Sequence, residues 1–278
     1  MPVPSSCLRP IVSGSLQNRT TMASRKVRLR RTLIAAGIVG GVVWAIASCA
    51  GTGFMQGGPR TVALPLPVAA PLPVLAEGIA TEDIRTTPVN ILADETWVAE
   101  TAAATGIPER TLFAYAGVAL RKSATDPNCQ VTWNTLAAIG WVESHHGTIF
   151  GGKILPDGFA SEPIYGVPLT GGEFMNIPDF DDGNFDGTAE FDRAVGPMQI
   201  IPATWAAWHV DGNLDGSEDG QQIDDSTLAA AGYLCFSGGD LSTQTGWDKA
   251  VTAYNQAPQY IIDIAAQADK YAAAVGAS

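Results

Sequence analysis

Apolar residues at helical spacing, interrupted by proline and glycine, run through the second half of this chain. In the clearest case, residues 109–122, an apolar stripe with i, i+3, i+4 and i+7 spacing follows Pro108, a residue type favoured at helix starts. No stretch shows a convincing alternation of apolar and polar residues, the mark of a half-buried strand. The pattern predicts a mainly α-helical domain over residues 88–278, with further helices at 132–143, 226–236, 247–254 and 258–275 and one starting near Pro202.

A long stretch rich in glycine and aspartate, residues 147–195, separates two of these predicted helices. Loops of this length inside a domain are uncommon and usually functional. It has room for a small β-hairpin, the one strand element that we expect.

Residues 1–50 have the order of an export signal, a basic run at 25–31 followed by an uncharged apolar run at 32–50. The apolar run is also long enough to span a membrane, and the sequence Ile-Ala-Ser-Cys ending at Cys49 resembles the lipobox of bacterial lipoproteins. Three outcomes therefore stay open: lipidation of Cys49, simple cleavage, and retention as a membrane anchor. Each predicts a protein outside the cytoplasmic membrane, in the cell envelope or secreted.

Residues 51–87 begin with a segment rich in glycine, alanine and proline and without helical or strand periodicity. Such composition predicts a semi-extended linker between the membrane and the domain.

The charges of the chain are divided unevenly. All 28 acidic residues lie at or after Glu77, where only eight of the 16 basic residues are found, so this part carries a net charge of −20. A surface of this sign cannot neutralise phosphates, which excludes nucleic acid as a predicted partner.

The chain has four cysteines, of which Cys7 and Cys49 fall in the N-terminal segment. Cys129 and Cys235 remain as the one pair in the predicted domain. In an oxidising compartment such a pair most often forms a disulfide, and we expect one here in preference to two free thiols.

Glu143 is an acid at the predicted C-terminal end of helix 132–143, on the same face as Leu136 and Ile139. The partly negative helix end and apolar surroundings both disfavour a carboxylate, so we expect a raised pKa. A general acid that works near neutral pH needs such a pKa. Taken alone, the spacing is equally compatible with an ordinary surface glutamate.

Three short blocks follow in order: Glu-Ser-His-His-Gly at 143–147, Gly-Pro-Met-Gln-Ile-Ile-Pro-Ala-Thr-Trp at 196–205, and Ala-Tyr-Asn at 253–255. Together they resemble the lytic murein transglycosylases, most closely the membrane-bound B-type branch and its actinobacterial relatives. The resemblance covers roughly residues 88–275. It implies a lysozyme-like helical fold and cleavage of the bond between N-acetylmuramic acid and N-acetylglucosamine, with formation of 1,6-anhydromuramic acid ends.

The resemblance implies that Glu143 is the sole catalytic group, first as acid and then as base. It also implies that residues of the three blocks contact substrate. Gly196 would allow close approach of the backbone, Met198 would offer a soft apolar wall, and Gln199 would bind hydroxyl or acetamido groups. The other expected substrate-binding residues are Ser144, Tyr254 and Asn255.

Two other functions remain as alternatives: a hydrolytic, lysozyme-like muramidase, and a cell-wall binding module without turnover. The expected partners are peptidoglycan glycan strands, the membrane through the N-terminal segment, and proteins of cell-wall synthesis or division. No cofactor is required for the chemistry.

Two segments of the form D-x-N-x-D-G suggest bound Ca²⁺ as a structural ion. In the second, Asp211, Asn213, Asp215 and Asp219 occupy positions one, three, five and nine of an EF-hand loop, and the first begins at Asp182 with Glu190 ninth. The bidentate Glu of position twelve is missing from both, so turns rich in Asp and Asn are the competing interpretation. His145 and His146 lack the further ligands that a zinc site would need.

Overall fold

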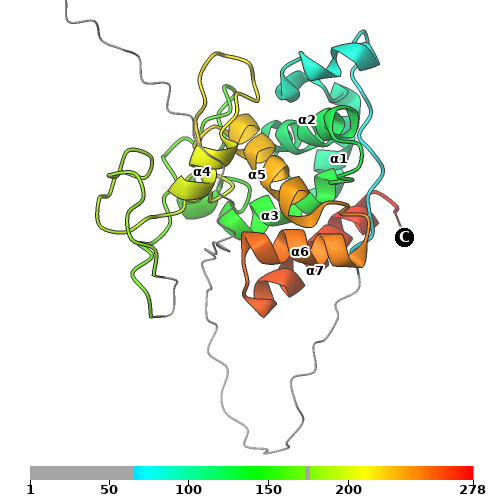
Figure 1. Cartoon of the computed structure of the whole chain (residues 1–278). Helices are drawn as coiled ribbons and strands as arrows, with labels where there is room; N and C mark the ends of the chain where they lie inside the picture. Colours follow the sequence, from blue (N-terminus) through cyan, green and yellow to red (C-terminus); the bar gives the residue numbers. More distant parts are fainter. Residues whose placement is uncertain (1–65, 173–175, 278) are drawn as a thin grey trace, which may run out of the picture. The chain divides into compact units, whose positions relative to one another are not determined.

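The structure, a computed structural model, describes residues 66–172 and 176–277, and helices dominate these ranges. The α-helices are α1 (Glu95–Thr105), α2 (Glu109–Thr125), α3 (Trp133–Ser144), α4 (Pro202–Trp208), α5 (Ile223–Gly238), α6 (Gln244–Tyr254) and α7 (Pro258–Ala274) (Figure 1). Short 3-10 helices occur at η1 (Thr81–Arg85), η2 (Val89–Ile91) and η3 (Ile149–Gly151). The predicted mainly α-helical class is confirmed. None of the described helices has the length and apolar composition needed to cross a membrane.

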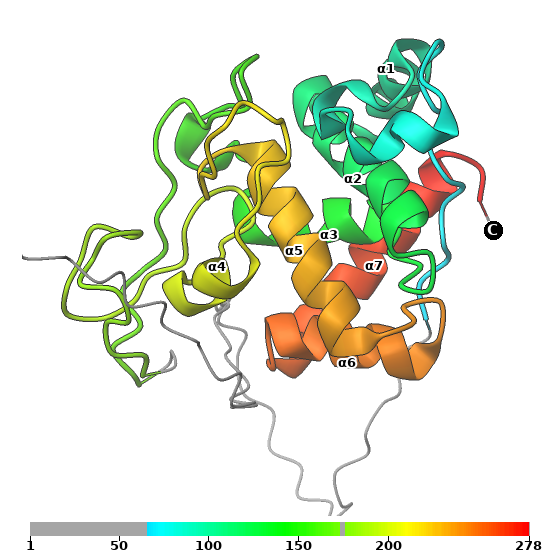
Figure 2. The same cartoon turned by 45° about the horizontal axis from the view of Figure 1, so that its top comes forward.

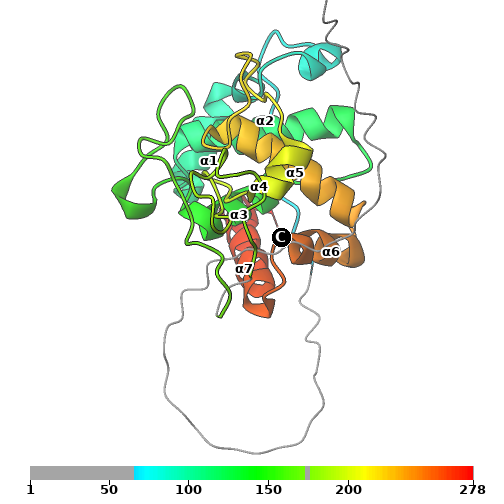
Figure 3. The ribbon, with the colours of Figure 1, turned by 60° about the vertical axis from the view of Figure 1, so that its left-hand side comes forward.

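Helix α3 is buried along most of its length, and it packs against α2 and α7 (Figure 3). All residues of α3 except Trp141 and Val142 are buried, because the helix is apolar on nearly every side and must be surrounded. Its first turn is capped by the Thr132 side chain, which accepts the Thr135 N–H. At Gly140 a Cβ would lie 1.9 Å from the Tyr115 hydroxyl, so glycine is required where α2 and α3 approach each other.

Helix α5 packs against α2, α4 and α6. In Figure 2 it separates α4 and the long segment after α3, on the left, from α1 and α2, on the right. The catalytic candidate Glu143 lies in the last turn of α3, shortly before this long segment begins.

The long segment, described over 147–172 and 176–201, contains isolated antiparallel bridges instead of regular strands. Examples are Thr170 with Asn176 and Pro178 with Phe191. The expected small hairpin is therefore present only as paired single residues within the described ranges.

Residues 66–87 lie along the domain. The Val68 N–H donates to Asp269 Oδ1 (2.7 Å), and the Trp133 Nε1–H donates to the carbonyl of Pro71 (3.0 Å), while Ala70 is buried. Residues 66–87 are the described part of the predicted semi-extended linker (51–87), and backbone groups of this part find partners on α3 and α7. The rest of that linker (51–65) and the predictions for residues 1–50, including lipidation of Cys49, lie outside the described residues.

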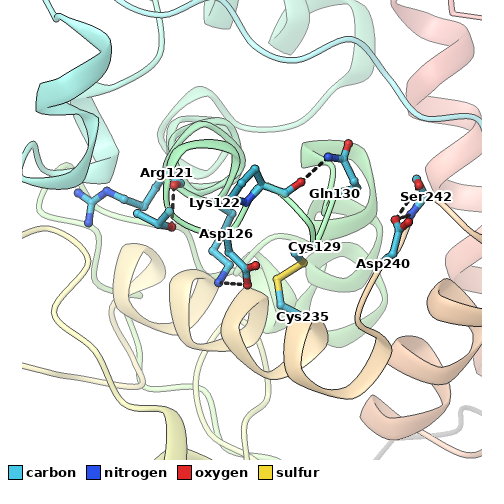
Figure 4. The surroundings of a disulfide bond; sticks show 10 residues. Arg121, Lys122, Asp126, Cys129, Gln130, Cys235, Asp240 and Ser242 are labelled. Atoms are coloured by element: carbon cyan, nitrogen blue, oxygen red, sulfur yellow. Dashed lines mark hydrogen bonds and ion pairs between the residues drawn. A yellow bond between two sulfur atoms is a disulfide. The ribbon is translucent and has the colours of Figure 1, made fainter.

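The disulfide joins Cys129, in the loop after α2, to Cys235 in α5 (Figure 4). Its sulfur atoms are 2.00 Å apart, and it closes a loop of 106 residues. The predicted pairing is confirmed. Both side chains are buried, and the neighbouring Leu241 N–H donates to the Cys129 carbonyl (2.8 Å), so the bond ties the start of α3 to the far end of α5.

Candidate functional site

Glu143 lies in the last turn of α3, and its side chain is only 9% exposed. The helix ends because His145 adopts a left-handed conformation (φ 51°), which allows its N–H and that of His146 to donate to the carbonyls of Trp141 and Gly140. The local sequence therefore delivers a carboxyl group to the buried side of a helix end, as predicted.

The nearest polar partner of Glu143 comes from α7. The Tyr260 hydroxyl donates to Glu143 Oε1 over 2.7 Å, and both side chains are buried. Burial raises the pKa of Glu143 from 4.5 to about 8, and the Tyr260 hydrogen bond opposes the rise because it favours the charged form. At neutral pH the carboxyl group therefore holds a proton that it can donate.

Replacing Tyr260 with Phe tests this electrostatic description. Loss of a hydrogen bond that favours the carboxylate should raise the pKa of Glu143 further, so the group should titrate at higher pH. The measurement is an NMR titration of ¹³C-labelled glutamate side chains, with Glu143→Gln identifying the signal. The exposed Tyr165→Phe is the matched control and should leave the midpoint in place. An unchanged or lower midpoint in Tyr260→Phe would contradict the assigned role of this hydroxyl.

Residues 196–199 form a tight turn between Val195 and Ile200, which exchange both backbone hydrogen bonds. Two motif side chains hold this turn in place. The Ser144 hydroxyl donates to the Pro197 carbonyl, and the Tyr254 hydroxyl donates to the Met198 carbonyl, each over 2.7 Å. The three sequence blocks therefore meet in space, through hydrogen bonds from α3 and α6 to one turn.

Three of the expected substrate-binding residues are buried or closely packed at this turn. Ser144 is 1% exposed and Met198 is 0% exposed, so neither presents a surface to a sugar. Gly196 does permit a close backbone approach, but the approaching group belongs to the protein: a Cβ here would lie 1.7 Å from the Gly220 carbonyl oxygen. In the described structure these residues shape the turn through contacts within the protein.

The remaining three candidates are also largely buried. The Gln199 side-chain amide donates to the Gly196 carbonyl (3.0 Å), and the Tyr254 hydroxyl donates to the Met198 carbonyl. Asn255 accepts the Ala257 N–H through Oδ1 (3.0 Å) and lines a cavity beside Glu143. Of the six expected substrate-binding residues, Asn255 is thus the one that borders open space in that cavity.

That cavity, of about 500 Å³, lies between the end of α3 and α7, along which its lining residues extend from Gln259 to Lys270. Its walls combine aromatic, amide and charged side chains: Trp141, Val142, His145, Asn255, Gln259, Tyr260, Asp263, Ala266, Gln267 and Lys270. Glu143 is not part of the wall, but its neighbour Val142 and its partner Tyr260 are. A ligand in this cavity would contact the hydrogen-bonded pair of Glu143 and Tyr260 at the edge of the cavity.

The two histidines after Glu143 differ in their surroundings. His145 is exposed and packs on Trp141, with ring centroids 4.5 Å apart. His146 is buried, and its two ring nitrogens are bonded to the hydroxyls of Tyr115 (3.1 Å) and Tyr271 (2.7 Å). Burial lowers the pKa of His146 to about 3, so it is a neutral packing residue.

The second candidate calcium loop is built from hydrogen-bonded turns. Asp211 accepts the N–H groups of Asp215 and Gly216, Asn213 accepts that of Asp215, and Asp219 accepts that of Gln221. Where carboxylates of the described residues converge as they would on a metal ion, Asp211, Asp215 and Asp219 are not involved. These hydrogen bonds give the loop the geometry of Asp- and Asn-rich turns.

Sequence reasoning missed Tyr260, the direct partner of Glu143, because it belongs to a different helix, 117 residues later. The available signal was an aromatic residue two positions after Pro258, at the start of a helix. Comparison of the chain with protein-family models, curated proteins and solved structures found no match.

Proposed function

We propose that this protein is a peptidoglycan lytic transglycosylase in which Glu143 acts alone as acid and then base. The observation that carries the proposal is a buried glutamic acid with a pKa of about 8, bonded to Tyr260 at the edge of a cavity. A group that is protonated at neutral pH, yet still able to ionise, suits general acid catalysis. The meeting of the three motif blocks around one turn adds support.

In the proposed reaction the Glu143 carboxyl gives its proton to the glycosidic oxygen as the bond to the anomeric carbon of N-acetylmuramic acid breaks. The resulting carboxylate then takes the proton of the muramyl C6 hydroxyl, whose oxygen bonds to the anomeric carbon. The products are a free N-acetylglucosamine end and a 1,6-anhydromuramic acid end, and Glu143 is protonated again. Tyr260 would stabilise the carboxylate between the two steps by donating to Oε1.

A hydrolytic muramidase is the second candidate, and one residue favours it. Most glycosidases use two carboxyl groups, and Asp263 lines the same cavity, where it accepts a hydrogen bond from Gln259 (2.8 Å). Water activated by Asp263 would leave a reducing end instead of an anhydro end.

Mass spectrometry of the fragments released from purified peptidoglycan tests the proposal. We expect products that terminate in 1,6-anhydromuramic acid, formed by the wild type and retained by Asp263→Asn. Reducing ends, lost in Asp263→Asn, would establish the hydrolase instead. Binding to glycan strands without any released fragment would identify a non-catalytic wall-binding module.

If peptidoglycan is the substrate, proposals for the fold, the location and the partners of the protein follow. The domain would have the lysozyme-like helical fold of this enzyme class, and the protein would be exported and held at the outer face of the cytoplasmic membrane or released into the envelope. It would act on glycan strands beside proteins of cell-wall synthesis or division.

A further inference from the structure

Three aspartates of the long segment after α3 bring their carboxylates together. Asp179, Asp181 and Asp186 each place a carboxylate oxygen within 4.8 Å of the others. The convergence follows from a tight turn: Asp182 and Gly183 have left-handed backbones (φ 58° and 70°), and their N–H groups donate to the Asp179 carboxylate. Local hydrogen bonds alone explain this turn, so convergence is not by itself evidence of a ligand.

Asp192 supplies independent evidence. Its side chain is fully buried, and Oδ1 accepts the N–H of Phe180, the residue between Asp179 and Asp181 (2.9 Å). Its second oxygen, Oδ2, is buried and has no hydrogen-bond partner in the described parts of the chain. Asp181 Oδ1 is likewise buried and unpartnered there. Buried carboxylate oxygens without partners are strongly unfavourable, so each calls for an explanation.

The charges in this cluster are poorly balanced by the protein. Among the described residues, the ion pairs that form involve other carboxylates. The one adjacent cation, Arg193, directs its guanidinium to the Asp186 backbone carbonyl and over the Tyr165 ring, 4.6 Å from its centroid.

We propose that Asp179, Asp181, Asp186 and Asp192 form a binding site for one Ca²⁺ ion. Oxygen ligands only, several of them charged, match the preference of Ca²⁺, which takes six to eight oxygens and tolerates irregular geometry. Backbone carbonyls and water complete the shell. The other convergent group of the described residues, Asp126 with Cys129 and Cys235, is excluded because its sulfurs are joined in the disulfide.

This site differs from the one that the EF-hand pattern predicts. The pattern would use the side chains of Asp182, Asn184, Asp186 and Glu190 as ligands. However, the backbone of Asp182 is left-handed, and the side-chain amide of Asn184 donates to the Asp181 carbonyl. The ligand set therefore starts three residues earlier and ends two residues later. The site does not depend on the proposed enzymatic activity.

The position of the proposed site connects the ion to the turn at 196–199. Asp192 lies four residues before Gly196, and the N–H of Arg193 donates to Asp186 Oδ2 (2.5 Å). Phe185, within the same loop, stacks on Trp205 of α4, with ring centroids 5.2 Å apart and planes at 10°. Bound Ca²⁺ would fix both ends of the segment 179–193 and so stabilise its packing against α4.

Isothermal titration of the EDTA-treated full chain with CaCl₂, in mild detergent, tests the proposal. We expect one site with a Kd between about 10⁻⁶ and 10⁻³ M, the range of sensor and extracellular modules, and weaker binding of MgCl₂. Asp181→Asn and Asp192→Asn should each weaken Ca²⁺ binding at least tenfold. The matched control, Asp211→Asn with Asp215→Asn in the other loop, should leave it unchanged.

Thermal unfolding separates ligand loss from misfolding. Without Ca²⁺, Asp181→Asn should melt at or above the wild-type Tm, because it removes one of several repelling charges. It should also lose the increase in Tm that CaCl₂ gives the wild type. Absence of binding up to millimolar CaCl₂, or loss of binding in the 211/215 control with retention in Asp181→Asn, would overturn the proposal.

Discussion

Glu143→Gln is expected to lower the rate of glycan-strand cleavage by about 10³-fold or more, since a positioned general acid typically contributes 10² to 10⁴ and here the same group also serves as base. Glutamine keeps the size of the side chain and an oxygen that can accept from Tyr260, but it has no proton to give. The assay is release of soluble muropeptides from purified peptidoglycan. The matched control is Glu100→Gln, an exposed glutamate of α1, which should retain wild-type activity.

The same substitution should make the fold more stable at alkaline pH, which separates a catalytic defect from unfolding. The pKa of Glu143 is about 8 in the folded protein and 4.5 as the ordinary value, so between these values the folded state binds a proton that the unfolded state has released. The free energy of unfolding therefore falls as pH rises through this window. Ionisation costs the wild type on the order of 4 kcal/mol at pH 8.

Urea unfolding at pH 5 and pH 8 measures this difference. The free energy of unfolding of Glu143→Gln should exceed that of the wild type at pH 8 and approach it at pH 5. If the variant is instead less stable at pH 8, the buried, protonated carboxyl group is the wrong description. If it is stable and still cleaves glycan strands at the wild-type rate, Glu143 is not the catalytic group.

Removal of the disulfide should be the largest purely structural change. Replacing Cys129 and Cys235 together with alanine should lower the free energy of unfolding by about 4 kcal/mol, because the bond closes a long loop and restricts the unfolded chain. Urea unfolding with and without reductant measures the effect. The wild type should lose stability on reduction, whereas the double variant should be insensitive to it. A wild type that reductant leaves equally stable would contradict this role.

The sequence predicted most of the helices, and the exceptions have a physical cause. Helices α2, α3, α6 and α7 end within a few residues of their predicted limits, because proline starts and glycine or asparagine stops are local signals. Helix α1 was missed: its sequence contains threonine, alanine and glutamate with no apolar stripe. Its burial of Val98 and Ala102 depends on neighbouring elements, which periodicity does not encode.

The sequence likewise predicted one part of the candidate site and missed another. The position of Glu143 and the direction of its pKa shift follow from a helix end and an apolar face, and both agree with the structure. The contacts that the flanking motif residues make within the protein were not predictable from their types. Met198 and Ser144 look suited to a sugar, yet both are buried in contacts of the turn at 196–199. The residue type determines which groups a side chain can bind, whereas its burial determines which groups it contacts in the folded protein.

By itself, therefore, the sequence determined the helical class, the pairing of Cys129 with Cys235 and the location of one acid at a helix end, since each rests on spacing or on a count. Only the tertiary structure decided that Tyr260 donates to Glu143, that Asp179, Asp181 and Asp186 converge, and that Asp192 accepts a hydrogen bond from the same loop. Those contacts join residues on different helices or on opposite ends of an irregular loop. Their geometry depends on how whole elements pack, and no local periodicity carries that information.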